Sequence, residues 1–444
     1  MRSQRDHRPH IQHISTILGV RLPRRDPNTL WDISIDRGQI SQVTPHETRD
    51  SSSEPLPGVL DATGRLIAPS LCHAHIHLDK CFLLQDPKFA DLQITKGNFE
   101  EAMELTSQAK SRFEEEDLLR RGRRLVEESI NFGVTSMRAF VEVDRVVQLK
   151  CLTAGLILKK EFIGRCDIQI CAFAQLPLFS GYDGDDNNCN LLAEAATRYG
   201  VDVLGSAPYV EENEQNMVRN VYFISKLAVT HGKHLDFHMD YNIDSSSEPF
   251  IWSAFEVVKS NRWFCNASKG KLLTFGHCTR LIFFNTEEWI RLRHMTRNFP
   301  ISFIGLPTSD LFMMRSASKV RGTLDILEMI KAYGLKAAIS VNNVGNAFTP
   351  QGNVDPLSVA CLGVAVYQAA TKEDTEILFE SVSTRAKRAI GLRSASLDIS
   401  PGEPADFVIF DAVDASWRNR KSISEVVYDA GIARQTIKAG LLVS

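Results

Sequence analysis

The sequence of 444 residues lacks the features that mark membrane and secreted proteins. No stretch approaches the ~20 consecutive apolar residues that a membrane-spanning helix needs. The first residues, Met1 to Pro9, are polar and have no apolar centre of the kind found in secretory signals. Nine cysteines are scattered without a regular spacing, which is typical of free thiols in a reducing compartment. We therefore expect a cytoplasmic protein with no membrane partner.

The sequence also lacks a large excess of charge of either sign. Its formal net charge is −3 at pH 7, which argues against general electrostatic binding to nucleic acid. Hydrophobic residues make up 43% and charged residues 24%, as in ordinary globular proteins. A chain of this length can bury a large core and hold more than one domain. These totals favour a globular protein that binds a small molecule.

From Leu66 onward the sequence alternates between apolar runs and amphipathic segments. The apolar runs predict eight strands, one at 66–70 that leads into a histidine stretch and seven more at 134–143, 168–173, 203–207, 235–240, 272–277, 301–305 and 337–342. The segments between them predict helices, including 100–132, 147–162, 191–199, 216–231 and 324–333. Eight strand–helix units predict an α/β fold, a (β/α)8 TIM-like barrel over residues 66–397.

The two ends of the chain have a different pattern. Short strands alternate with turns before residue 65, and strands are predicted again at 406–410, 426–428 and 435–442. Two helices, at 356–370 and 375–390, precede this last part. We expect residues 1–65 and 398–444 to form a small composite β-sandwich domain beside the barrel. Polar loops are predicted at 46–57 and 183–188; the second contains several aspartates but not the ligand pattern of a calcium loop.

Histidines gather where the predicted strands end. His75 and His77 lie two residues apart, so on a strand they face the same side, and His73 lies further back, where we expect burial. Two histidines at this spacing could also lie at a strand end that binds no metal ion. The fifth strand ends in His238 and the sixth in His277, and the carboxyl ends of barrel strands meet at one mouth. Imidazoles from three strands at one mouth favour a metal site.

Several motifs resemble the amidohydrolase superfamily and, within it, the cytosine deaminase branch. They are His75-Ile76-His77-Leu78-Asp79, Phe173-Ala174-Gln175, His238-Met239-Asp240, Gly276-His277 and the late strand Pro404 to Phe410. Their order and approximate spacing match from about residue 60 to the C-terminus. The resemblance implies a hydrolase that acts on C–N bonds of a cyclic amide or amidine, and it favours a homo-oligomer.

The resemblance also implies roles for individual residues. His75, His77 and His238 would hold one divalent metal ion, with Zn²⁺ expected and Fe²⁺ as the alternative. His277 would donate a hydrogen bond to the water or to the tetrahedral intermediate. Substrate contacts are implied for Gln175 and expected for Leu83, Asn343 and Phe348. The fourth strand ends without a lysine, so we expect a single metal ion rather than a bridged pair.

Two positions depart from the family pattern. Asn342 stands where an aspartate completes the metal site, and an amide cannot accept a proton at neutral pH. Tyr241 stands where a glutamate carries a proton to the substrate, and a phenol is a poor replacement for that carboxylate. The first departure also predicts weak metal binding or loss of the metal.

Three interpretations follow from these departures. In the first, hydrolysis survives, with Asp240, Glu142 or Asp144 supplying the base from a shifted position. In the second, the barrel has been reused for a non-hydrolytic step such as a cyclisation or an isomerisation. In the third, the protein binds a small molecule without catalysis. All three require a small-molecule pocket at the barrel mouth.

Overall fold

The structure, a computed structural model, describes residues 12–47, 56–180, 187–266, 270–314, 320, 322–411 and 420–444. Parts of both predicted polar loops, at 48–55 and 181–186, lie outside these residues. Among the described helices, none combines the length and apolar character needed to cross a membrane.

Eight parallel strands form the centre of the molecule, as the alternating sequence pattern predicts. Each pairs with the next in chain order from β7 to β14. The strands are β7 (Leu71–His77), β8 (Val134–Glu142), β9 (Asp167–Ala174), β10 (Val201–Ser206), β11 (His234–Met239), β12 (Leu273–His277), β13 (Ile301–Gly305) and β14 (Ala337–Ile339). An isolated bridge between Ile76 and Asn342 joins the two edges of the sheet, so the chain has the predicted TIM-barrel architecture.

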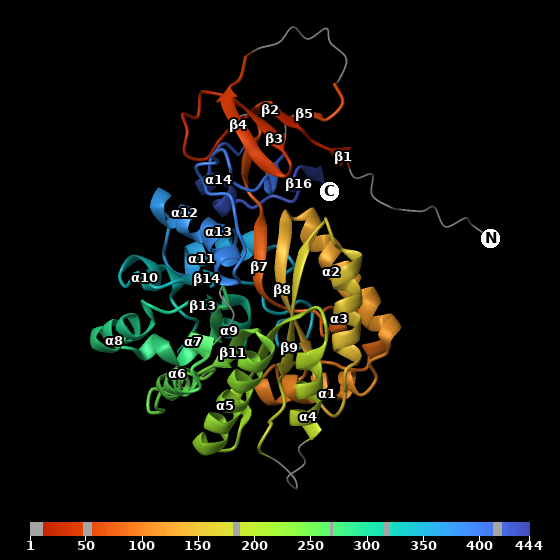
Figure 1. The fold of residues 1–444 in the computed structure, drawn as a ribbon, viewed down its shortest axis with the longest axis vertical. Coiled ribbons are helices and arrows are strands. Elements are labelled where there is room, and N and C mark those ends of the chain that lie inside the picture. Colours follow the sequence, from red (N-terminus) through yellow and green to blue (C-terminus); the bar gives the residue numbers. More distant parts are fainter. Residues whose placement is uncertain are drawn as a thin grey trace, which may run out of the picture.

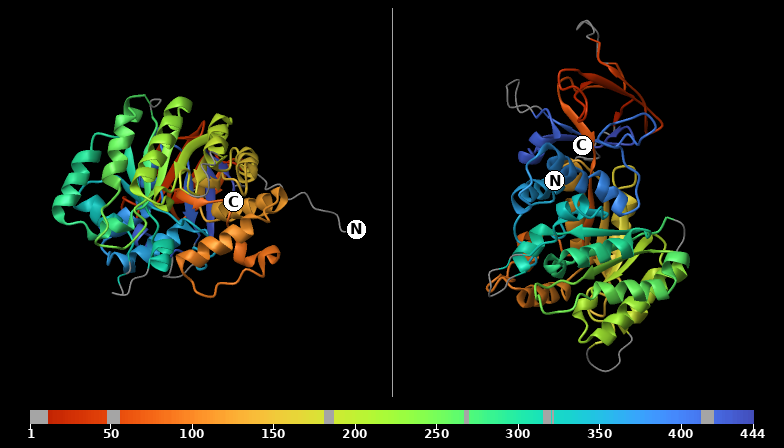
Figure 2. Two further views of the ribbon diagram at one scale, coloured as in Figure 1. Left: turned by 90° about the horizontal axis from the view of Figure 1, so that it is seen from below. Right: turned by 90° about the vertical axis from the view of Figure 1, so that its left-hand side faces the viewer.

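Helices surround these strands, as Figures 1 and 2 show. Those inside the barrel repeat are α1 (Phe99–Lys110), α2 (Glu115–Asn131), α3 (Lys150–Glu161), α4 (Asn187–Thr197), α5 (Glu214–His231), α6 (Ile251–Ser260), α7 (Trp263–Asn266), α8 (Thr286–Thr296), α9 (Pro307–Met313) and α10 (Ile326–Lys331). Those that follow are α11 (Pro356–Val366), α12 (Lys372–Ser381), α13 (Thr384–Ala389) and α14 (Ile423–Tyr428).

Two small sheets lie at one end of the barrel and join segments from both ends of the chain (Figure 1). One has the order β1-β17-β16-β15-β6 and the other β4-β3-β2-β5. Their strands are β1 (Gln12–His13), β2 (Thr16–Val20), β3 (Trp31–Asp36), β4 (Gln39–Pro45), β5 (Val59–Asp61), β6 (Leu66–Pro69), β15 (Phe407–Phe410), β16 (Arg434–Lys438) and β17 (Leu441–Leu442). A separate apolar core, which includes Ile17, Ile33 and Phe407, holds these sheets together.

Four sequence predictions differ from the structure. The run at 66–70 is not the start of the first barrel strand, because β6 pairs with β15 in the small sheet and the barrel begins at Leu71. The predicted strand at 426–428 is part of α14, whose cap Ser422 accepts a hydrogen bond from the backbone of Glu425. The helices predicted at 100–132 and 375–390 are each two helices.

The break in the first of these segments has a local cause. Glu114 has an extended backbone and begins a capping box with Asp117, so a new helix starts there. The break lets α1 turn across the barrel mouth while α2 packs along the outside. The side chain at the end of α1, Lys110, is thereby buried beside the strand ends.

The interior of the barrel below the mouth is filled by a buried ionic group, which we call the floor cluster: Arg138, Gln169, Asp236 and Thr274. Arg138 and Asp236 are both 0% exposed, and Nη1 of Arg138 lies 2.8 Å from Oδ2 of Asp236. Nη1 also donates to Thr274 Oγ1 at 2.7 Å, and Nε and Nη2 both donate to Gln169 Oε1 at 3.2 Å. All three nitrogens of the guanidinium are therefore engaged.

The first barrel strand contains an irregularity that separates its histidines. The register between β7 and β8 shifts between His73 and Ile76. His73 Nε2 lies 3.1 Å from the hydroxyl oxygen of Ser129 on α2, outside the barrel. His75 and His77, beyond the shift, face the mouth. The expected burial of His73 is confirmed, but its ring points to a helix rather than into the barrel.

Candidate active site

Strands β7 and β11 bring three histidine rings together at the mouth of the barrel. The potential ligand nitrogens of His75, His77 and His238 all lie within 4.8 Å of one another. All three side chains are buried, and burial is the main cause that lowers the pKa of each ring well below its ordinary value. The rings are therefore neutral, which is the form that binds a metal.

The hydrogen bonding of these rings tests whether a metal ion fits. Within the described residues, His75 Nδ1 and Nε2, His77 Nδ1, His238 Nε2 and Asn342 Oδ1 are buried without a hydrogen-bond partner. Buried polar atoms are rarely left unpaired in native proteins, because the lost hydration is costly. Three neutral imidazoles and one amide oxygen, all lacking partners, are a donor set that fits a single divalent ion such as Zn²⁺.

A glycine leaves the space that the ligand rings occupy. A Cβ atom at Gly276 would lie 3.1 Å from Cε1 of His75 and 3.7 Å from Cδ2 of His238. The first of these distances is tighter than ordinary van der Waals contact. Any side chain at position 276 would press on His75, so this position determines where that ring lies.

The seam that closes the barrel fixes His75 and Asn342 relative to each other. Ser340 Oγ donates to the backbone oxygen of His75 at 2.7 Å and accepts from its N–H at 3.0 Å. The N–H of His77 donates to the backbone oxygen of Asn342 at 2.8 Å. Asn342 Nδ2 donates to Ser309 Oγ at 2.8 Å, which leaves its Oδ1 as the amide atom without a partner among the described residues.

His277 is paired with a carboxylate that the sequence did not single out. Nδ1 of His277 lies 2.8 Å from Oδ1 of Asp310, which is fully buried at α9. The other oxygen of Asp310 accepts from Thr323 Oγ1 at 2.9 Å and from the N–H of Leu306 at 3.3 Å. Burial raises the pKa of Asp310, while the hydrogen bonds from His277 and Thr323 oppose that rise.

The orientation of His277 follows from this pair. Because a carboxylate can only accept, Nδ1 carries the hydrogen, and Nε2 is left for the cavity as an acceptor in the neutral ring or a donor in the imidazolium. His277 lines a small cavity together with His77 and His238, and its backbone has a left-handed φ of 66°. Asp310 therefore fixes the orientation of the ring, and the donor role that the resemblance implies requires the protonated form.

A small cavity, which we call the reaction cavity, opens beside these groups and has a volume of about 20 Å³. The structure places three of the predicted substrate contacts, Gln175, Asn343 and Phe348, in its wall, and Leu83 is absent from that wall. Its lining residues are His77, Lys80, Phe99, Gln175, Tyr209, His238, Tyr241, His277, Asn342, Asn343 and Phe348. The sequence had not singled out Tyr209 as part of the site. It belongs to the turn after β10, whose position over the mouth no local motif encodes.

Tyr241 lies in the cavity wall and stacks on His277, with 3.9 Å between the ring centroids. Burial raises the pKa of its phenol well above the ordinary value. A phenol that stays protonated cannot act as a base at neutral pH. Tyr241 therefore supplies an apolar surface against His277.

Asp240 and Leu83 lie outside the reaction cavity. The carboxylate of Asp240 accepts from the N–H groups of Phe250 and Ile251, at 2.8 and 3.0 Å, at the start of α6. Burial raises its pKa to about 6, and these hydrogen bonds oppose the rise. Leu83 is buried in the main apolar core. The structure thus uses Asp240 to hold a loop and does not bring it to the metal ligands.

The other two candidate bases, Glu142 and Asp144, belong to a second buried ionic group. This rim cluster consists of Lys80, Lys110, Glu142 and Asp144. Lys80 Nζ lies 2.9 Å from Oε1 of Glu142, and Lys110 pairs with both Glu142 and Asp144. Burial opposes the charged form of Glu142, but Lys110 and Lys80 outweigh it and lower its pKa to about 2. A carboxylate held in this way is a weak base.

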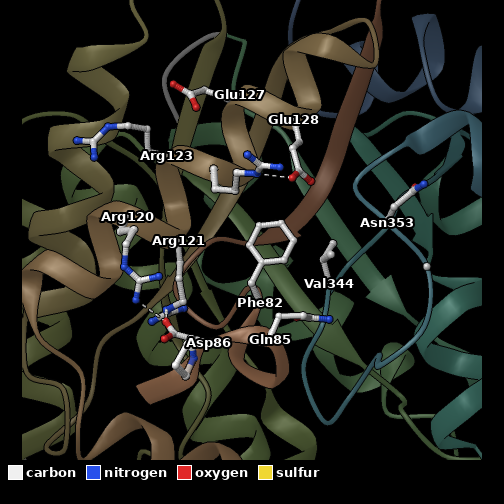
Figure 3. Close-up of a pocket in the computed structure, with 13 residues that line it drawn as sticks. Phe82, Gln85, Asp86, Arg120, Arg121, Arg123, Glu127, Glu128, Val344 and Asn353 are labelled. Atoms are coloured by element: carbon white, nitrogen blue, oxygen red, sulfur yellow. Dashed lines mark hydrogen bonds and ion pairs between the residues drawn. The ribbon is translucent and has the colours of Figure 1, made fainter. Parts of the chain in front are cut away.

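A larger cleft of about 620 Å³ lies against α2, and Figure 3 shows its lining. Its arginines are paired: Arg120 with Asp86 at 2.6 Å, Arg121 with Asp117 at 2.8 Å, and Arg124 with Glu128. Arg121 is only 2% exposed. The lining of this cleft does not include His75, His77 or His238, so the cleft is separate from the histidine cluster at the barrel mouth.

Comparisons with known proteins point to one group of enzymes. No protein-family model matches the chain. It is 23% identical over 363 residues to the N-isopropylammelide isopropyl amidohydrolase of Pseudomonas sp. (strain ADP), covering 81% of this chain and 83% of that protein.

Solved structures show the same fold over nearly the whole chain. The 5-methylcytosine deaminase of Klebsiella pneumoniae, liganded with 5-fluorocytosine, matches with a TM-score of 0.81 at 24% identity and covers 97% of each chain. The N-isopropylammelide isopropylaminohydrolase of Burkholderia multivorans matches with a TM-score of 0.74 at 22% identity and covers 96% of each chain. These likenesses show that the chain has the fold of these enzymes over nearly its whole length.

Proposed function

We propose that the protein is a hydrolase with one metal ion that cleaves a C–N bond at a carbon of a small nitrogen heterocycle. The observation that carries this proposal is the pair of His277 and Asp310, with 2.8 Å between Nδ1 and Oδ1. Hydrolysis needs a group that takes a proton from water and delivers it to the leaving nitrogen. His277, held by Asp310, can act as such a group. The amide of Asn342 and the phenol of Tyr241 cannot accept a proton at neutral pH.

The proton path uses residues of this chain. His277 Nε2 accepts a proton from the attacking water, and Asp310 holds the ring in the required tautomer and stabilises the imidazolium that forms. A C–O bond forms at the ring carbon, the C–N bond breaks, and His277 returns the proton to the departing amine. A divalent ion held by His75, His77 and His238 would act as a Lewis acid and lower the pKa of a water.

The other cavity residues bind and orient the ring. Gln175 and Asn343 offer amide groups that can donate to and accept from ring nitrogens and oxygens. Phe99 and Phe348, with 5.8 Å between ring centroids, supply aromatic surface. The relatives whose names mention N-isopropylammelide and 5-methylcytosine suggest the first compounds to assay.

A second function, a non-hydrolytic step in the same pocket, is favoured by one observation. Asn342 donates through Nδ2 to Ser309, so an amide rather than a carboxylate is built into the hydrogen bonding of the seam. An active site with an amide in place of this carboxylate would bind a heterocycle and rearrange it without adding water.

The experiment measures metal content and amine release together. Purified protein is analysed for zinc, loaded with one equivalent, and assayed with cytosine, 5-methylcytosine and N-isopropylammelide. We expect turnover of at least one compound, and Asp310→Asn should lower kcat by roughly 10²–10⁴ with zinc content retained. The matched control is Asp36→Asn, which changes a carboxylate that is 75% exposed, and it should behave as the wild type.

Two results would contradict the proposal. Protein that binds no stoichiometric zinc would exclude the metal-dependent mechanism. If Asn342→Asp alone produced hydrolysis of a cyclic substrate that the wild type leaves intact, the native chain would have lost hydrolytic chemistry, and the non-hydrolytic function would replace it.

A further inference from the structure

A cleft of about 560 Å³ opens at the end of the barrel opposite the histidines, and we call it the basal cleft. It lies between α13, the end of α10 and the first residues of β13 and β14. Its lining residues are Leu272, Pro300, Ser302, Ile330, Gly334, Leu335, Lys336, Ala337, Arg385, Arg388 and Ala389. None of these residues lines the reaction cavity, so the two spaces are separate.

Helix α13 closes the lower end of the barrel and forms one wall of the basal cleft. Ala386, Ala389 and Ile390 share a small apolar core with buried side chains of β7, β13 and β14. The backbone oxygen of Ile390 accepts a hydrogen bond from Gln169 Nε2 of the floor cluster at 2.8 Å. The basal cleft therefore lies directly below the floor cluster.

Ser302 brings a free hydroxyl group to the inner end of the basal cleft. It is paired with Thr274 of the floor cluster, and paired residues of parallel strands point to the same side of the sheet, here the barrel interior. Ser302 is 5% exposed, and its hydroxyl has no hydrogen-bond partner within the described part of the chain. Buried polar groups are normally hydrogen-bonded, so this hydroxyl indicates a partner that enters from the cleft.

The charged side chains that line the basal cleft are all cations. They are Lys336, Arg385 and Arg388, and no aspartate or glutamate is found among the described lining residues. Arg385 is balanced by Glu380, with 3.1 Å between Nε and Oε2. Lys336 Nζ lies 3.4 Å from the backbone oxygen of Phe299, and neither Lys336 nor Arg388 has a carboxylate partner in the described ranges. Two positive charges therefore remain without a counter-charge.

The cleft against α2 shows that such an imbalance is not a general property of this protein. Its arginines Arg120, Arg121 and Arg124 each have a carboxylate partner. The chain as a whole carries a formal net charge of −3. Positive charge without partners is thus a local feature of the basal cleft, and it favours a ligand of opposite charge.

The rest of the basal cleft is mainly apolar. Leu272, Pro300, Ile330 and Leu335 supply aliphatic surface between the two free cations and the strands. Small-molecule sites combine an apolar lining with a few polar groups that fix the orientation of the ligand. Apolar walls, one free hydroxyl and two free cations match a molecule with a ring or chain at one end and an anion at the other.

We propose that the basal cleft binds a small organic anion, in which a phosphate or carboxylate group contacts Lys336 and Arg388 while an apolar ring or chain lies on the aliphatic walls. Ser302 donates a hydrogen bond to the inner end of this ligand. The site lies at the opposite end of the barrel from the histidines, so it does not depend on the proposed function.

The test measures the binding of four compounds to the full chain by calorimetry. Phenyl phosphate and benzoate each carry a ring and an anion, benzyl alcohol has the ring without the charge, and inorganic phosphate has the charge without the ring. We expect phenyl phosphate or benzoate to bind roughly tenfold more tightly than either of the last two compounds. The tighter of the two ring anions identifies the anionic group, and its affinity should fall as salt is added.

Substitutions connect this affinity to the basal cleft. Lys336→Gln and Arg388→Gln should each weaken binding of the ring anion roughly fivefold, and the double variant should bind it no better than benzyl alcohol. Ser302→Ala should weaken binding by a smaller factor. The matched control is Arg37→Gln, which removes an arginine that is 93% exposed in the small sheets and should leave the affinity unchanged.

Three results would overturn the proposal. The first is equal affinity for the ring anions and benzyl alcohol, and the second is equal affinity for phenyl phosphate and inorganic phosphate. The third is binding that stays unchanged in the Lys336→Gln/Arg388→Gln double variant, because the anion would then lie elsewhere, for instance at the barrel mouth. Thermal unfolding of each variant checks that the protein is folded.

Discussion

The floor cluster and the rim cluster are both buried ionic groups inside one barrel, yet their cations differ in the donors that they leave unused, while Asp236 Oδ1 of the floor cluster is buried without a partner among the described residues. In the floor cluster every nitrogen of Arg138 donates a hydrogen bond to a neighbouring side chain. In the rim cluster Lys80 has one acceptor among the described residues and borders the reaction cavity. A buried cation whose N–H groups all donate within the protein fills and stabilises a core. A buried cation with free N–H groups beside a cavity is available to a ligand. The clusters should therefore respond differently to substitution.

The largest effect on stability is expected at the floor. Arg138→Leu leaves Asp236 buried without its cation and should lower the free energy of unfolding by about 3–5 kcal/mol. Urea unfolding of the full chain measures this. The double variant Arg138→Leu/Asp236→Leu should recover part of the loss, because no uncompensated charge remains. If the single and double variants were equally unstable, packing rather than charge would account for the effect.

Glu142→Gln tests the rim cluster and gives a pH-dependent result. The pKa of Glu142 is about 2 in the fold against a usual 4.5, so its charge stabilises the folded protein above pH 4.5. That contribution disappears as pH falls from 4.5 toward 2. We expect the variant to be less stable than the wild type at neutral pH, with the difference shrinking across this range in urea titrations.

The control for this experiment is Glu161→Gln. Glu161 is paired with Arg123 at 2.6 Å, but its side chain is 37% exposed and solvent screens the pair. Its pH dependence should be weak. A difference between wild type and Glu142→Gln that stayed constant from neutral pH to pH 2 would mean that the charge of Glu142 does not stabilise the fold.

Gly276→Ala tests the position of the His75 ring. The added Cβ would lie 3.1 Å from Cε1 of His75, so the ring must shift. We expect a loss of roughly 10–100-fold in zinc affinity, comparable to the removal of a group that orients a ligand. Competition with a chelator measures it. Gly402→Ala, where nothing lies within 4 Å of the added atom but the φ of 86° strains the backbone, separates a general loss of stability from loss of metal.

The smallest effect is expected on the surface. Arg124 pairs with Glu128 on α2, and its side chain is 69% exposed. Arg124→Ala should change the free energy of unfolding by less than about 1 kcal/mol and leave zinc binding unchanged. A larger change would mean that the cleft against α2 contributes more to the fold than its paired charges indicate.

The sequence predicted the barrel and the histidine cluster at its mouth because both leave local signals. Alternation of strands and helices has a period that can be read from apolar residues, and His75 and His77 stand two apart at a strand end. The strand predicted at 426–428 was wrong because a run of three apolar residues fits either a strand or the turn of a short helix.

The pair of His277 and Asp310 left no such signal, nor did the burial of Thr106 and Lys110 on α1. Asp310 is 33 residues from His277 and lies in a short helix, where one acidic residue has many ordinary explanations. Thr106 and Lys110 belong to a charged amphipathic segment and look like solvent-facing residues. Their burial depends on the break at Glu114, which directs α1 across the mouth, and that is a property of tertiary packing.

The backbone at the barrel mouth has one further consequence. Asp240, His277, Cys278 and Asn342 all have left-handed φ angles, between 48° and 68°. Each such non-glycine residue costs on the order of 1 kcal/mol. The packing and hydrogen bonds around these four buried residues must hold the turns against that cost, so part of the stability of the fold is spent on aiming His277 and Asn342.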